Sequence, residues 1–152
     1  MLAATFSALH VLSLGIGLGA VFARGRALRT VARGGLQAIP SVLRADGFWG
    51  LAAVLWVATG AARLFGELDK GLDFYLYNGF FWLKMGLFAT ILVLEVTPML
   101  TLIRWRVAIG KGAPIDTRRA GLLANLNAIE IALVVLIPFA AAAMARGLWL
   151  LT

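Results

Sequence analysis

Four long stretches of this chain are almost free of charged side chains, and this pattern constrains the fold more than any other feature. The stretches span residues 1–23, 47–62, 75–103 and 120–145. A helix needs about 20 residues to cross roughly 30 Å of hydrocarbon, because each residue adds about 1.5 Å. Three stretches reach that length directly, and the second does so when its charged flanks extend toward the lipid headgroups. We therefore predict an all-α integral membrane four-helix bundle.

The predicted bundle occupies the whole chain as a single transmembrane domain, residues 1–152. Its four helices are expected at residues 2–23, 46–65, 77–103 and 120–146. Hydrophobic residues make up 62% of the chain, against about 45–50% in globular domains, so the helices lack the polar face that a soluble bundle needs. The absence of cysteine excludes thiolate zinc sites and thiol enzymes. No basic region precedes the first apolar stretch, which argues against a cleavable signal peptide.

Basic residues gather in two of the three connections between the predicted helices. These residues are Arg24, Arg26, Arg29, Arg33 and Arg44 in the first connection and Arg104, Arg106, Lys111, Arg118 and Arg119 in the third. The second connection holds Glu67, Asp69 and Asp73 but only Lys70, with Arg63 just before it. The positive-inside rule therefore predicts two basic cytoplasmic loops and both termini outside. The net charge of +7 then reflects membrane topology, and no nucleic-acid partner is expected.

Two further features lie in the first third of the chain, and the first of them has two interpretations. The first basic loop can form a helix that lies on the anionic leaflet, or it can be a solvated loop. The apolar residues of that helix would be Leu28, Val31, Ala32, Leu36 and Ile39. Gly15 and Gly19 are spaced to let another helix approach the first one closely.

Titratable residues inside the predicted spans are the candidate functional residues, because an ionisable side chain in hydrocarbon is costly and often marks a site. His10 lies about 13 Å along its helix from the external end, and Lys84 lies at a comparable depth. Arg63 closes the second helix on the same side. If all three face inward, they form a cluster with one histidine and two cations. Such a cluster can hold a haem through His10 and an anionic group, such as a haem propionate, through a cation.

Glu95 and Glu130 lie in the opposite half of the predicted bundle. Asn127 precedes Glu130 by one helical turn, so the two share a face. Lys84 and Glu95 are about three turns apart, which also places them on one face. A polar seam through the bundle is expected, and two nearby carboxylates can hold one proton between them. Alternatively, each glutamate only bonds a neighbouring helix or pairs with Arg44. Lys84, Glu95 and Glu130 are the candidate catalytic residues.

The whole chain resembles a family of short bacterial inner-membrane proteins, the domain of unknown function 2214 family. The likeness is carried by Ala8-Leu9-His10, Phe81-Trp82-Leu83-Lys84, Leu94-Glu95-Val96-Thr97-Pro98-Met99 and Arg104-Trp105-Arg106. That family has no established activity, so the resemblance implies a multi-pass protein of the bacterial inner membrane and little more.

More distantly, the order of these signals is similar to the four-helix membrane protoporphyrinogen oxidase family of bacteria, whose members bind haem b. The matching positions are His10, Trp82, Lys84, Asn127 and Glu130. This resemblance implies that His10 ligates the haem iron and that Lys84 is an essential polar partner. The chain departs from that pattern because Trp82 and Lys84 stand one residue closer. Its first helix also lacks the aromatic, Pro-Arg-containing end expected after the histidine.

Two hypotheses follow for function. In the first, the protein binds haem b through His10, with Lys84 and Arg63 as further cofactor-binding residues, and oxidises a porphyrinogen or a quinol. With a single histidine, a second iron ligand has to come from Met85 or Met99, from a homodimer or from a partner. In the second hypothesis, the bundle holds no cofactor and acts as an accessory subunit of a membrane complex, or as a small-solute or proton-coupled carrier. Lipid surrounds the bundle in both.

Overall fold

Four long helices dominate the protein. The computed structural model describes residues 1–66 and 71–151, and within these ranges the long helices are α1 (Leu2–Ala32), α2 (Ile39–Phe65), α4 (Gly79–Gly110) and α5 (Ala120–Ala145). A 3-10 turn, η1 (Leu36–Ala38), precedes α2, and a short helix, α3 (Leu72–Leu76), precedes α4. All four long helices, α2 together with η1, are long and apolar enough to cross a membrane. The prediction of an all-α membrane bundle is therefore confirmed.

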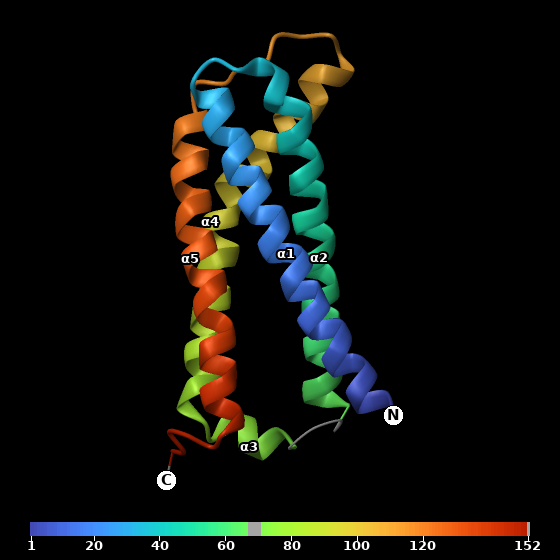
Figure 1. Ribbon diagram of the computed structural model, residues 1–152, viewed down its shortest axis with the longest axis vertical. Coiled ribbons are helices and arrows are strands. Elements are labelled where there is room, and N and C mark those ends of the chain that lie inside the picture. Colours follow the sequence, from blue (N-terminus) through green and yellow to red (C-terminus); the bar gives the residue numbers. More distant parts are fainter. Residues whose placement is uncertain (67–70, 152) are drawn as a thin grey trace.

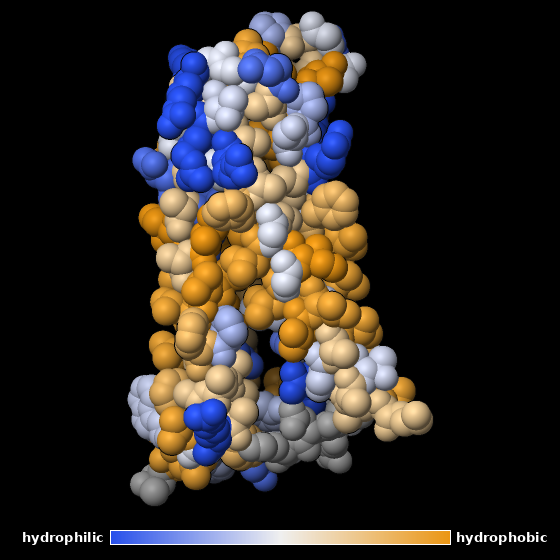
Figure 2. All heavy atoms as spheres, in the orientation of Figure 1, coloured by the Kyte–Doolittle hydropathy of each residue, from blue (hydrophilic) through white to orange (hydrophobic). Residues whose placement is uncertain are grey.

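The helices pack in the order α2, α1, α5, α4. Helix α1 contacts both α2 and α5, and α4 packs on α5. Figure 1 shows α1 running obliquely across the bundle, and both chain termini lie at the same end, beside α3. The α1–α2 and α4–α5 connections meet at the opposite end. We call these the termini end and the basic end. Figure 2 shows an apolar belt between a hydrophilic surface at the basic end and a mixed surface at the termini end.

The helices are longer at the basic end than the sequence predicted. Helix α1 continues to Ala32 instead of residue 23, and α4 continues to Gly110 instead of residue 103. Arg24, Arg26 and Arg29 therefore belong to α1, where we expected a loop. The same correction applies to Arg44 in α2 and to Arg104 and Arg106 in α4. The remaining basic residues of the two connections lie outside the helices, as predicted, namely Arg33, Lys111, Arg118 and Arg119. At 31 residues, α1 is about 46 Å long, so it extends well beyond the hydrocarbon.

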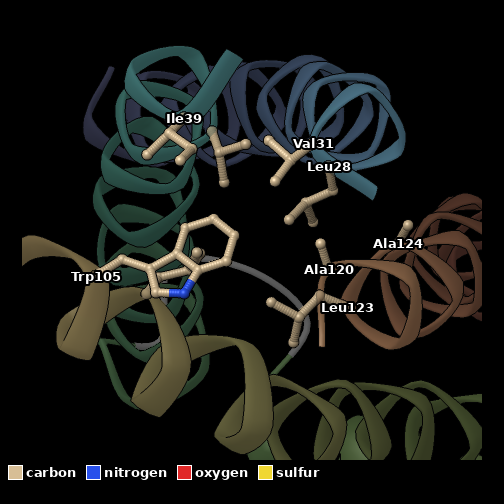
Figure 3. Close-up of a cluster of buried hydrophobic side chains, with 9 residues drawn as sticks. Leu28, Val31, Ile39, Trp105, Ala120, Leu123 and Ala124 are labelled. Carbon is tan, nitrogen blue, oxygen red and sulfur yellow. The ribbon is translucent and has the colours of Figure 1, made fainter. Parts of the chain in front are cut away.

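A buried hydrophobic cluster explains why the helices continue at the basic end. Figure 3 shows Leu28 and Val31 of α1 facing Ile39 of α2, Trp105 of α4 and residues of α5. Of the two alternatives for this segment, the surface helix is therefore wrong for Leu28, Val31 and Ile39, whereas Ala32 and Leu36 are exposed. The solvated loop is wrong as far as Ala32, because α1 continues to that residue. Leu28, Val31 and Ile39 are buried, and burying them is the driving force for extending the helix. The Trp105 indole also donates a hydrogen bond to the Asp116 carbonyl oxygen (2.9 Å), which fixes the α4–α5 connection.

The termini end is closed by the C-terminal segment. Asn78 is fully buried, caps α4 by accepting from the Phe80 amide (2.9 Å) and donates to the Leu148 carbonyl oxygen (3.1 Å). The Gly79 amide donates to the Trp149 carbonyl oxygen (2.9 Å), and a Cβ at Gly79 would collide with the Trp149 ring. A larger residue at this position therefore requires the Trp149 ring to move. Glu67, Asp69 and Lys70, which the charge pattern assigned to the acidic connection, lie outside the described residues.

Candidate functional site

A large cavity lies between the helices toward the termini end. Its volume is about 550 Å³, within the range of about 300–1,000 Å³ that is usual for small-molecule sites. All four long helices and α3 contribute to its walls, which are largely apolar and aromatic. Figure 2 shows a hollow in the lower half of the visible face, bordered by both hydrophilic and apolar side chains. The cavity thus has the general character of a site for an amphipathic ligand.

The structure brings His10, Arg63 and Lys84 to this one cavity. His10 comes from α1, Arg63 from the last turns of α2 and Lys84 from the second turn of α4. The Lys84 ammonium also lies 5.5 Å from the centre of the Phe81 ring, a cation–π contact. An apolar chamber with two cations and one imidazole in its walls favours ligands that combine a hydrophobic body with one or more carboxylates.

The His10 ring is held from several sides. It stacks on Trp56, with the ring centres 5.4 Å apart, and its Cε1 would lie 3.2 Å from a Cβ at Gly60. The Thr59 hydroxyl donates to the Leu55 carbonyl oxygen (2.7 Å), so the Thr59 oxygen accepts from Nδ1 of His10 (2.9 Å). With the proton assigned to Nδ1, Nε2 keeps its lone pair. Histidines that ligate a metal commonly have this arrangement: one ring nitrogen donates a hydrogen bond that fixes the orientation of the ring, and the other nitrogen binds the metal.

A second polar site lies between this cavity and the basic end, centred on Arg24. The guanidinium is fully buried and donates five hydrogen bonds to side chains of the other three long helices. Two go to the two oxygens of Glu95 (2.6 and 2.8 Å), and one each to Asp46 (2.9 Å), Glu130 (2.7 Å) and Asn127 (2.8 Å). We call these five residues the Arg24 network.

Further contacts complete the Arg24 network. The Asn127 amide also donates to the Val21 carbonyl oxygen (2.8 Å), which joins α5 to α1 a second time. Asp46 accepts from Arg106 (2.7 Å), whose side chain is 41% exposed. The Trp49 ring lies 5.8 Å from the guanidinium carbon of Arg24. The network therefore ties all four long helices together.

The sequence indicated part of this arrangement and missed its centre. Glu95, Asn127 and Glu130 do converge, as the helical spacing predicted. Their partner is Arg24, whereas the sequence offered Arg44, which is exposed on α2. A signal for Arg24 was nevertheless present. It lies on the same helical face as Ala20, Val21, Leu28 and Val31, which are all buried, while Arg26 and Arg29 fall on the exposed face.

The structure also locates the glycines predicted to allow close helix packing and the methionines predicted as iron ligands. A Cβ added at Gly15 or at Gly19 would meet no atom within 4 Å, so none of the described helices approaches these two positions closely. Close approach occurs instead at Gly17, where a Cβ would lie 3.3 Å from the Trp49 ring. Met85 and Met144 line the large cavity, whereas Met99 does not.

An exposed ion pair on the α4–α5 connection provides a contrast with the Arg24 network. Arg118 donates to both carboxylate oxygens of Asp116 (3.0 and 2.8 Å), and both side chains are largely exposed. These hydrogen bonds lower the pKa of Asp116 to about 2. The pair lies outside the spans and serves below as a control position.

The chain belongs to the family described as Predicted membrane protein (DUF2214), whose family model matches residues 2–148. The resemblance to this family is therefore confirmed. No curated protein and no solved structure matches the chain.

Proposed function

We propose that this member of the DUF2214 family is a haem b-binding protein of the bacterial inner membrane, with a redox role and with His10 as an axial ligand of the iron. The observation that carries the proposal is the His10–Thr59 hydrogen bond, which orients a half-buried imidazole in the wall of a cavity of about 550 Å³ and leaves its Nε2 lone pair for the iron. By the positive-inside rule, the basic end faces the cytoplasm and the cavity lies in the outer half of the membrane.

The residues around the cavity fit a haem in four respects. The walls are apolar and aromatic, as a macrocycle requires, and Lys84 and Arg63 supply positive charge for its propionates. Met85 and Met144 in the walls are candidates for a second, thioether ligand. The Trp56 indole nitrogen is buried and has no hydrogen-bond partner among the described residues, so an acceptor on a bound molecule would satisfy it.

In this proposal each residue has a defined task. Haem b bound in the cavity would supply one-electron chemistry, for which a porphyrinogen or a quinol is the proposed electron donor. His10 sets the position of the ligand through the fixed orientation of its ring. Lys84 and Arg63 neutralise carboxylates and orient them toward the termini end, while Trp56 and Phe88 exclude water from the ring system.

An absorption spectrum of the detergent-purified, haem-supplied protein tests the proposal directly. We expect a Soret band in the oxidised protein and sharp bands after reduction with dithionite. His10→Ala should lose them. The matched control is Leu9→Ala, because Leu9 lies on the same turn of α1, is exposed toward lipid and does not line the cavity. This control should keep the full spectrum.

A flat spectrum from folded wild-type protein would overturn the haem proposal. His10 would then be a packing residue that stacks on Trp56, and the protein would act without a cofactor, as an accessory subunit or a carrier. If the bands appear, anaerobic oxidation of a porphyrinogen and of a quinol are the next two assays, and they separate the two proposed substrates.

A further inference from the structure

The charges of the Arg24 network and of Arg106, which pairs with Asp46, do not balance. Arg24 and Arg106 carry two positive charges, while Asp46, Glu95 and Glu130 carry three negative charges when all are ionised. Together, the Arg24 network and Arg106 would then hold one uncompensated negative charge, and the three carboxylates that share it are fully or largely buried. An unpaired charge in such surroundings is strongly unfavourable, and a single added proton removes it.

The hydrogen bonds indicate which carboxylate takes that proton. Glu95 accepts from Arg24 at both oxygens, and Asp46 accepts from Arg24 at one oxygen and from Arg106 at the other. Glu130 accepts one bond from Arg24 at Oε2, while its Oε1 is buried and has no partner among the described residues. The Glu130 side chain is also completely buried. The negative charge of Glu130 is therefore less stabilised than that of Glu95 or Asp46.

We propose that the Arg24 network is a proton-binding centre, with Glu130 as the residue that carries the exchangeable proton. The groups that face it are Arg24 on α1, Asp46 on α2, Glu95 and Arg106 on α4, and Asn127 on its own helix α5. Because Arg24 donates to Glu95 and Glu130 through the same nitrogen, Nη2, the two carboxylates are close neighbours and the proton can pass between them. The inference stands on this network alone and does not depend on haem.

A small, mostly apolar cavity lies beside Glu95 of the network and shares wall residues with the large cavity. Its volume is about 60 Å³, more than the roughly 10–15 Å³ that one water molecule needs. Glu95 and Ser13 provide polar groups in its walls, and it shares Leu14, Trp56 and Phe88 with the large cavity. We assign this small cavity as the route by which the proton of Glu130 exchanges, through Glu95, with the large cavity.

Infrared spectroscopy of the protein in liposomes tests the proton-binding centre. A protonated carboxylic acid has a C=O stretching band that is separate from the carboxylate bands and shifts in deuterium oxide. We expect this band in the wild type at neutral pH. The band should be lost in Glu130→Gln. In Glu130→Asp it should remain at a shifted frequency, because substituting the residue that carries the proton changes the C=O group that gives the band. The control Asp116→Asn alters an exposed acid outside the spans and should leave the band unchanged.

Two results would overturn the proposal. One is the absence of the band from folded wild-type protein, and the other is a band that persists unchanged in Glu130→Gln. Glu130→Gln is expected to fold, because it replaces a neutral acid by a neutral amide of the same size. If it does not fold, the absence of a frequency shift in Glu130→Asp overturns the assignment instead.

The route has its own test. Ala53 lines the small cavity, so Ala53→Leu fills it, whereas Ala58→Leu places the same side chain on the exposed face of α2. We expect Ala53→Leu to slow the deuterium shift of the Glu130 band at least tenfold while the band itself remains, and Ala58→Leu to have no effect. Equal exchange rates in the two variants would show that the proton does not travel through the small cavity.

Discussion

Replacing Arg24 should destabilise the protein more than any other single change to its charged residues. Arg24→Met introduces an apolar side chain of similar length, removes five hydrogen bonds and leaves the three acidic residues of the network without their shared cation. Removing one partner of a buried ion pair costs about 3–5 kcal/mol in soluble proteins. Hydrogen bonds within membranes average about 0.6 kcal/mol each, so five of them amount to about 3 kcal/mol. Both estimates place the expected loss in the free energy of unfolding near 3–5 kcal/mol.

The loss can be measured by equilibrium unfolding in mixed micelles, followed by tryptophan fluorescence. Trp49 is a natural reporter, since its ring lies against the Arg24 guanidinium. Arg24→Lys should give an intermediate value, because lysine keeps the charge but cannot form the forked pair with Glu95. Arg118→Met, which removes an exposed arginine from the α4–α5 connection, should be indistinguishable from the wild type. The reasoning is refuted if folded Arg24→Met unfolds within about 1 kcal/mol of the wild type, since the buried pairing would then contribute far less than such pairs do.

Two further predictions concern the cavity and its closure. Thr59→Val removes the acceptor for Nδ1 of His10 and should weaken haem binding by about 10–100-fold in a haem titration. Thr101→Val, a buried threonine that likewise bonds back to its own helix but is remote from His10, is the control, and equal affinities in the two variants would contradict the orienting role of Thr59. Gly79→Ala should displace Trp149 and break the hydrogen bond from the Gly79 amide, so that a protease cleaves the C-terminal segment faster. The control is Gly86→Ala, whose added methyl group meets open space and should leave the cleavage rate unchanged. An unchanged cleavage rate in Gly79→Ala would disprove the contact.

The sequence was sufficient to predict the four helices and the convergence of Asn127 with Glu130, because both depend on local periodicity. It was not sufficient to predict where the helices end at the basic end. There, charge suggested loops, but Leu28, Val31 and Trp105 form a buried core that no single segment reveals. The pairing of Arg24 with Asp46 was also beyond reach. It depends on how far α1 is shifted along α2, and a single sequence does not contain that information.

The helical spacing of polar residues on α1 and α4 places both polar sites on the interior faces of these two helices. His10 and Arg24 are 14 positions apart on α1, about four helical turns, so both face the interior and lie about 21 Å apart along the helix axis. Lys84 and Glu95 repeat this arrangement on α4 over about three turns. One face of each helix thus carries a cavity residue toward the termini end and a network residue toward the basic end. A redox ligand at His10 and a proton on Glu130 would therefore lie in opposite halves of the bundle, on either side of the small cavity that Trp56 and Glu95 line.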